Sequence, residues 1–159
     1  MTEAISIREV GPEAIDDAML VTTEAFDPDY REAWTADQCL SMLSLPGVWL
    51  TLAYVEDRPA GFTLNRVIAG EAELLLLAVT STCRNRGIGR LLITQAMRSS
   101  RERNAEALHL EVRHNNPAFQ LYINCGFRIA GRRPGYYLGK DGRNHDAVTL
   151  SCLLYQNSS

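Results

Sequence analysis

The chain has 159 residues, of which 46% are hydrophobic and 22% are charged, and its formal net charge at pH 7 is −3. This length predicts one domain spanning residues 1–159, large enough to bury a sizeable core, and the ordinary composition is typical of a globular protein. The slightly acidic balance excludes the broad basic field of a nucleic-acid-binding protein. Local arginine clusters therefore indicate discrete anion contacts or solvated patches, and we expect no direct nucleic-acid binding.

The sequence also argues against a membrane segment and a metal centre. Its longest apolar run is far shorter than the roughly 20 residues that span a bilayer, and Met1-Thr2-Glu3 has neither the basic nor the apolar region of a signal peptide. The four cysteines are dispersed, without a CxxC pair or a Cys/His cluster. We expect a cytoplasmic protein with reduced cysteines, no metal and no membrane contact.

Two helices and three strands are expected in the first half of the chain: strands at 5–10, 48–55 and 60–67, and helices over 13–26 and after residue 35. Thr35 and Gln38 have the spacing of a capping box, which marks the start of the second helix. Trp34 stands just before this cap. It is either the hydrophobic staple of that helix or part of a substrate cleft.

The second half of the chain is expected to hold strands at 74–79, 107–113 and 147–154, a long helix over 90–103 and a short helix after residue 116. Asn116 is a good N-cap, Pro117 suits the first helical position, and Gly126 is a natural residue to follow the end of this short helix. Since strands precede, separate and follow a few helices, we expect an α/β (α+β) protein with one mixed sheet and helices on its faces.

The loop between the apolar strand at 74–79 and the long helix indicates an anion site, above all for a pyrophosphate. Gly87 and Gly89 would let the backbone approach a ligand and adopt positive φ angles, and Arg84 and Arg90 would add charge-assisted bonds to phosphate. The spacing fits neither a Walker loop nor the dinucleotide pattern, since Leu92 stands where a third glycine is required. A plain helix-entry turn is the alternative interpretation.

Two motifs resemble the GNAT superfamily of acyl-CoA N-acyltransferases. Arg84-x-x-Gly87-x-Gly89 after an apolar strand is similar to its Gln/Arg-x-x-Gly-x-Gly/Ala motif, and residues 115–127 are similar to its Asn-x-x-Ala-x-x-Leu-Tyr-x-x-x-Gly-Phe block. The resemblance implies the GNAT fold, with a single, mostly antiparallel mixed sheet flanked by helices. It also implies acetyl-CoA as co-substrate, with its pyrophosphate in the loop.

By the same resemblance, the backbone of the cofactor strand pairs with the pantetheine arm, and Asn115 either contacts that arm or steadies the helix start. The implied cofactor-binding residues are Leu77, Ala78, Val79, Arg84, Asn85, Arg86, Gly87, Ile88, Gly89, Arg90 and Asn115.

Leu-Glu-Val-Arg at 110–113 resembles a narrower group, the RimI-like N-terminal acetyltransferases, which acetylate the α-amine of a ribosomal protein that begins with alanine. The similarity covers roughly residues 24–150. It implies direct transfer in a ternary complex, with Glu111 as base and Tyr122 as acid, because a peptide α-amine with a pKa near 8 needs only a modest base. Glu111 as a solvated carboxylate and Tyr122 as a core aromatic are the alternatives. His109 shares the strand face of Glu111, yet a lone histidine is more often structural.

The acceptor side departs from the RimI-like pattern. Only His114 lies between Arg113 and Asn115, where two residues are usual, and Leu138 stands where a proline commonly follows the paired tyrosines. The acceptor therefore stays open: a protein N-terminus such as that of a ribosomal protein, a lysine, a polyamine or another small amine, with a non-catalytic acyl-CoA-binding module as a second alternative. The residues expected to bind the acceptor are Glu24, Trp34, Tyr136 and Tyr137, although packing explains the tyrosines nearly as well.

Overall fold

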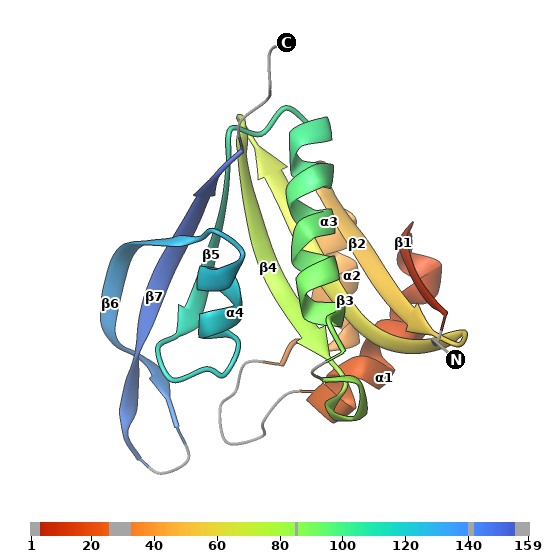
Figure 1. Cartoon of the computed structure of the whole chain (residues 1–159), viewed down its shortest axis with the longest axis horizontal. Helices are drawn as coiled ribbons and strands as arrows, with labels where there is room; N and C mark the ends of the chain where they lie inside the picture. The colour runs from red at the N-terminus through yellow and green to blue at the C-terminus, as the bar shows by residue number, and fades with distance from the viewer. Residues whose placement is uncertain (1–3, 26–32, 85, 140–141, 155–159) are drawn as a thin grey trace.

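One seven-stranded sheet forms the centre of the molecule, in the order β1-β2-β3-β4-β5-β7-β6 (Figure 1). The computed structural model describes residues 4–25, 33–84, 86–139 and 142–154. Its strands are β1 (Ile5–Val10), β2 (Val48–Val55), β3 (Arg58–Ile68), β4 (Glu71–Val79), β5 (Ala107–Arg113), β6 (Arg128–Leu138) and β7 (Asn144–Leu153). Neighbouring strands are antiparallel except for the parallel pair β4–β5. This architecture confirms the expected mixed, mostly antiparallel sheet.

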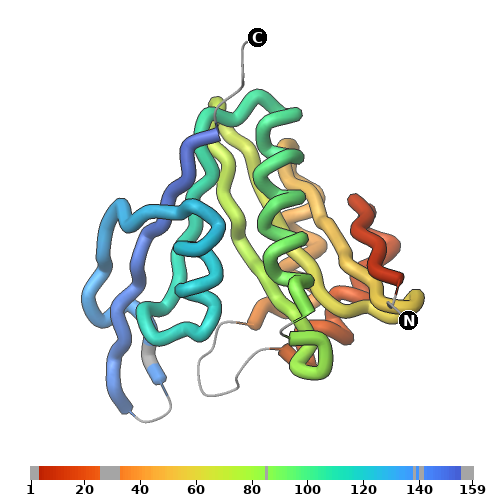
Figure 2. The backbone as a smooth tube through the Cα atoms, in the orientation of Figure 1, coloured from red at the N-terminus to blue at the C-terminus, as the bar shows by residue number. Residues whose placement is uncertain are grey.

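Helices cover both faces of the sheet (Figures 1 and 2). The helices α1 (Ile15–Ala25) and α2 (Ala36–Leu43) pack with side chains of β2, β3 and β4 in one apolar cluster. The helices α3 (Ile88–Glu102) and α4 (Phe119–Asn124) pack with β4, β5 and β7 in another. Within the described ranges, no helix has the length and apolarity needed to cross a membrane.

The expected capping box at the start of α2 is present. The Thr35 hydroxyl accepts a 3.1 Å hydrogen bond from the Gln38 backbone N–H, and the Gln38 side chain accepts one of 2.8 Å from the Thr35 backbone. Trp34 is half-buried and packs against the apolar cluster that contains Cys39. This contact supports the interpretation of Trp34 as a hydrophobic staple.

A β-bulge in β4 changes which face of the sheet its side chains meet. Leu64 of β3 pairs with Leu76, and the next residue, Asn65, pairs with Leu74, so Leu75 is an extra residue. Leu74 accordingly packs in the cluster of α3 and α4, whereas Leu76 packs in the cluster of α1 and α2. Bulges bend a strand and increase its local twist. The bulge therefore alters the course of β4 just before its C-terminal half.

The strands β4 and β5 diverge beside this bulge. In the described part of the chain their ladder has three pairs, and the last of them joins Glu73 to His109. Figure 1 shows the two strands separating from the end at which they pair. The stretch where residues 74–79 and 110–113 run apart is called the β4–β5 divergence below.

The short helix α4 begins later than expected. Asn116 acts as a local cap, because its side-chain oxygen accepts a 2.8 Å hydrogen bond from the Ala118 backbone N–H. Its own N–H bonds to the Arg113 carbonyl at 2.9 Å, which closes a turn, and the helix starts only at Phe119. The expected start at Pro117 was therefore wrong, while Gly126, with φ +103°, follows the helix end as expected.

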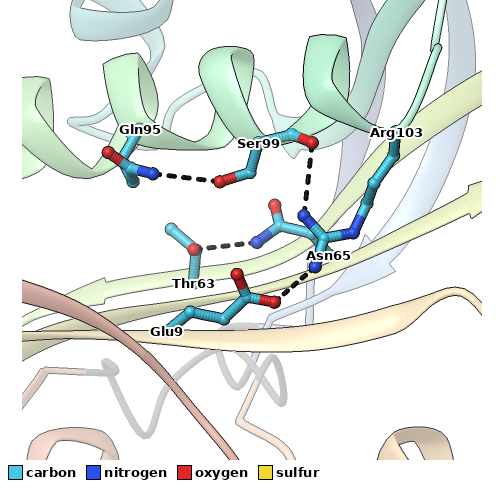
Figure 3. Close-up of polar contacts among 6 residues, drawn as sticks. All are labelled: Glu9, Thr63, Asn65, Gln95, Ser99 and Arg103. Atoms are coloured by element: carbon cyan, nitrogen blue, oxygen red, sulfur yellow. Dashed lines mark hydrogen bonds and ion pairs between the residues drawn. The ribbon is translucent and has the colours of Figure 1, made fainter.

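The far end of α3 is fastened to the sheet by Arg103 (Figure 3). Its guanidinium lies 3.8 Å from the centre of the Trp49 ring, forms an ion pair with Glu9 of β1, and donates to the Ser99 carbonyl at 3.2 Å. Beneath the helix, Asn65 donates a 2.9 Å hydrogen bond to the Thr63 hydroxyl. The Arg103 contacts hold the C-terminal end of α3 on β1 and β2.

Candidate active site

The N-terminus of α3 follows β4 through the turn η2 (Ser81–Cys83) and presents backbone donors. Gly87 is its N-cap residue, with φ +80° and no side-chain hydrogen bond that would cap the helix. A Cβ built at Gly87 would meet nothing within 4 Å. The first amides of this 15-residue helix thus lie beside open space, which suits an anion through both the N–H groups and the helix dipole.

Gly89 serves a different purpose from the expected one. It lies inside α3 in ordinary helical conformation, so the expectation of a positive φ there was wrong. A Cβ at Gly89 would come within 2.8 Å of Leu121 Cδ2. The missing side chain therefore lets α3 approach α4, and this contact sets where α4 stands relative to the anion loop.

The three arginines of the loop differ in their surroundings. Arg84 donates a 2.6 Å hydrogen bond from Nη2 to the carbonyl oxygen of Ala25, the last residue of α1. Arg86 and Arg90 are exposed, and Asn85 lies outside the described residues. Contacts of these side chains with phosphate remain predictions.

The cofactor strand has one paired edge and one edge at the β4–β5 divergence. Leu77, Ala78 and Val79 pair with β3. On their other side, β5 has left the ladder in the described part of the chain, so no strand pairs with them there. Their backbone groups at that edge are placed to bond an extended arm of a ligand, as an added strand would.

Glu111 and Tyr122 lie on opposite faces of β5. Leu110 and Val112 pack in the cluster of α3 and α4, so the intervening Glu111 points to the other face, where its side chain is 30% exposed. Tyr122 of α4 is 5% exposed and packs edge-on against Phe127, with ring centres 5.7 Å apart. The two candidate catalytic groups therefore lie on opposite sides of the sheet.

Glu111 has a basic neighbour that the sequence did not single out as a site residue. Arg133 Nε of β6 lies 3.3 Å from Glu111 Oε1. Arg133 belongs to a local arginine cluster with Arg128 and Arg132, for which the sequence indicates an anion contact or a solvated patch. The signal that could have found the pair is the position of Arg133 two residues after Gly131, which is matched with Glu111 through Thr149 of β7. This signal requires knowledge of the strand order.

The shortened link between β5 and α4 is held by several contacts. Arg113, which is 4% exposed, donates a 2.6 Å hydrogen bond to the side-chain oxygen of Asn115. The His114 backbone N–H bonds to the Asp146 carbonyl at 3.0 Å, and the His114 ring stacks on that of His145. The missing residue is thus accommodated by a tight turn that directs Asn115 back toward the end of β5.

His109 is engaged at the paired end of β4 and β5. Its Nε2 lies 2.5 Å from Glu71 Oε2, and its Nδ1 lies 2.6 Å from Ser151 Oγ. The two contacts connect His109 to the neighbouring strands β4 and β7. They lie at the end where β4 and β5 pair, away from the β4–β5 divergence. This geometry supports a structural role for His109.

The residues expected on the acceptor side fall into two groups. Tyr136 and Tyr137 lie on β6 with ring centres 5.1 Å apart, and Tyr136 is 53% exposed. Glu24 is exposed near the end of α1, and Trp34 precedes α2. Residues 26–32 between them are outside the described structure. The described residues contain no group of three His, Cys, Asp or Glu side chains that could hold a metal ion.

Comparison with known proteins places this site in a family. A profile of the family described as Acetyltransferase (GNAT) matches residues 14–127. The ribosomal protein bS18-alanine N-acetyltransferase of Haemophilus influenzae is 32% identical over 107 residues, which cover 67% of this chain and 73% of the relative. The Salmonella typhimurium protein of that name is 35% identical over 97 residues, or 60% of this chain and 65% of the relative. These relatives confirm the RimI-like resemblance.

Solved structures show the same fold. The ribosomal-protein-S18-alanine N-acetyltransferase of Escherichia coli matches with a TM-score of 0.87 and 24% identity, over 98% of this chain and 97% of that one. The PaiA N-acetyltransferase of Thermoplasma acidophilum, solved in complex with coenzyme A, matches with a TM-score of 0.74 and 18% identity, over 94% and 99%. The chain belongs to the acetyltransferase (GNAT) family and is an N-acetyltransferase.

Proposed function

We propose that this protein transfers the acetyl group of acetyl-CoA to the N-terminal α-amine of a protein, in a ternary complex of enzyme and both substrates. The observation that carries the proposal is the β4–β5 divergence, with the uncapped N-terminus of α3 at one end and Glu111 beside it. The names of the Haemophilus and Salmonella relatives support an acceptor that begins with alanine, and a ribosomal protein as its source.

The residues present fit acetyl-CoA. The first amides of α3, next to the open side of Gly87, would bind the pyrophosphate, with Arg84, Arg86 and Arg90 as surrounding cations. The unpaired edge of residues 77–79 would bond the pantetheine arm, and Asn115 would reach it from the α4 side.

The proposed chemistry joins the acceptor nitrogen to the acetyl carbon and breaks the carbon–sulfur bond of the thioester. Glu111 takes a proton from the acceptor amine, directly or through water, so that the neutral amine attacks. Tyr122 gives a proton to the leaving sulfur. Backbone N–H groups at the β4–β5 divergence polarise the thioester carbonyl. The two proton transfers would thus take place from opposite faces of β5, on which Glu111 and Tyr122 lie.

A thiol-release assay with acetyl-CoA and alanine-starting peptides tests the proposal, with mass spectrometry to locate the acetyl group. We expect turnover on the free α-amine and none on the same peptide with a blocked N-terminus. Acetylation of lysine side chains or polyamines, without any α-amine product, would contradict the acceptor class. Absence of turnover on every amine, with normal acetyl-CoA binding, would instead indicate a non-catalytic binding module.

A further inference from the structure

The candidate base is held in a network that extends to the edge strand β6. Thr149 of β7 pairs with both Glu111 of β5 and Gly131 of β6. Since alternate residues of a strand share a face, Arg133 lies on the same face as Gly131 and Glu111. Since Gly131 has no side chain, the Arg133 side chain can lie over this position and extend toward Glu111. Arg133 Nε lies 3.3 Å from Glu111 Oε1.

A second bulge determines what lies behind Arg133. Arg133 pairs with Ala147 and Tyr137 pairs with His145, so four steps along β6 match only two along β7. In a regular strand Tyr136, three positions after Arg133, would point to the opposite face. With the extra residues, the Tyr136 ring instead lies 5.3 Å from the guanidinium carbon of Arg133.

The bulge is itself fixed by two features. Gly135 has φ +66°, a conformation that residues with a Cβ rarely adopt. Its backbone N–H donates a 3.0 Å hydrogen bond to Asp146 Oδ1 of β7. Asp146 and Gly135 therefore shape the bulge that places the Tyr136 ring against Arg133.

We propose that Arg133 is a positioning residue that holds the Glu111 carboxylate toward the acceptor amine, and that Tyr136 acts behind it as an aromatic support. A side chain on an exposed strand face has several rotamers, and an ion pair with a cation that is itself stacked on a ring restricts them. The proposal rests on the proposed function, since Glu111 matters in this way only as a base. It gives Tyr136 a role other than acceptor binding.

Steady-state kinetics separate these roles. Arg133→Gln should lower kcat roughly tenfold or more, because a small misplacement of a catalytic group can cost about a hundredfold, while KM for acetyl-CoA and for the acceptor stays within about twofold. Arg133→Lys should recover part of the rate. Tyr136→Leu should behave like Arg133→Gln, whereas Tyr136→Phe, which keeps the ring, should match wild type. Arg128→Gln, an exposed arginine of the same strand, is the matched control.

Two kinetic outcomes would overturn the proposal: an unchanged kcat in Arg133→Gln, or a raised acceptor KM at constant kcat, which would make Arg133 an acceptor contact. Thermal unfolding of each variant shows whether the fold is intact.

Crystal structures of wild type and Arg133→Gln give a readout independent of turnover. We expect one ordered Glu111 conformer in wild type, and a turned or multiple conformer in the variant. The same single conformer in both would refute the positioning role, even for a protein that acetylates no amine and so fails the proposed function.

Discussion

Arg84 of the anion loop donates its 2.6 Å hydrogen bond to the carbonyl oxygen of Ala25, 59 positions earlier in the chain. The carbonyls at the end of a helix lack partners within it, and a cation there is favourable for the helix dipole. Arg84 thus connects the C-terminus of α1 with the start of the proposed cofactor site. A bound pyrophosphate would offer the same guanidinium a second acceptor.

Replacing Arg84 by alanine should therefore affect both affinity and stability. We expect the dissociation constant for acetyl-CoA, measured by calorimetry, to rise roughly tenfold, which corresponds to about 1.4 kcal/mol, and the melting temperature to fall by a few degrees. Arg98→Ala, an exposed arginine of α3, is the control. An unchanged dissociation constant would mean that Arg84 bonds to α1 but does not contribute to acetyl-CoA binding.

Substitutions at the two candidate catalytic residues should lower kcat without changing the affinity for acetyl-CoA. Glu111→Gln should lower kcat by about 10²–10⁴, the usual contribution of a general base. Tyr122→Phe should lower kcat at least about tenfold by removing the acid, while the ring remains packed on Phe127. Both variants should bind acetyl-CoA as wild type does, measured by calorimetry. A full rate for Tyr122→Phe would exclude it as the acid.

Gly89→Ala should destabilise the fold and move α4. Alanine favours a helix by about 1 kcal/mol over glycine, but here its Cβ would come within 2.8 Å of Leu121 Cδ2, and overpacking costs about 1–3 kcal/mol. We expect a net loss of stability in urea unfolding, together with weaker acetyl-CoA binding. The double variant Gly89→Ala with Leu121→Ala removes the clash, so it should show strong non-additivity. Strict additivity would rule out this contact as the cause.

Arg103→Ala should weaken the attachment of α3 to the sheet. It loses the stacking on Trp49 and the ion pair with Glu9, and we expect the free energy of unfolding to fall by about 1–2 kcal/mol. Chemical denaturation measures this change, with Arg98→Ala again as the control. Lysine at position 103 should restore only part of the loss, because it lacks the planar group that stacks on the indole.

The cysteines should differ in their reaction with iodoacetamide. Burial raises the pKa of the thiols of Cys39, Cys125 and Cys152, so the reactive thiolate is scarcer than usual near pH 8 and increases only as the pH rises toward the raised pKa. Cys83, in the turn before the anion loop, is less buried than Cys39 and Cys152. Mass spectrometry should find Cys83 labelled before Cys39 and Cys152 at pH 7.5. Prior labelling of a buried cysteine would contradict the packing described above.

Much of the fold could be predicted because local patterns agree with the tertiary structure. Strands at 5–10, 48–55 and 107–113 have the expected bounds, since alternation and apolar runs there match the faces that are buried. The capping box of Thr35 and Gln38 depends only on residues three positions apart. The mixed sheet followed from the order of these elements.

The remaining features depend on partners far along the chain. Nothing near Leu75 marks it as a bulge, because any of several leucines could be the extra residue. Gly89 was assigned a positive φ, but it is small because Leu121 approaches it. Arg133 meets Glu111 only through β7, which lies between their strands. Most cofactor-side candidates lie close together in the sequence, in one strand and the loop after it, whereas the acceptor-side candidates come from α1, from the residue before the cap of α2 and from β6.

The bulge at Leu75 makes the pairing register of β4 more critical than its side chains. An isoleucine or methionine in this strand would change only the local fit. If β4 instead paired with β3 in a simple two-residue repeat, with Leu75 no longer an extra residue, residues 76–79 would exchange faces. The side chains of Leu76 and Ala78 would turn from α1 and α2 toward α3, and the edge that faces β5 would shift by one residue. The bulge at this one residue thus decides whether the hydrophobic layer and the ligand-facing edge can exist together.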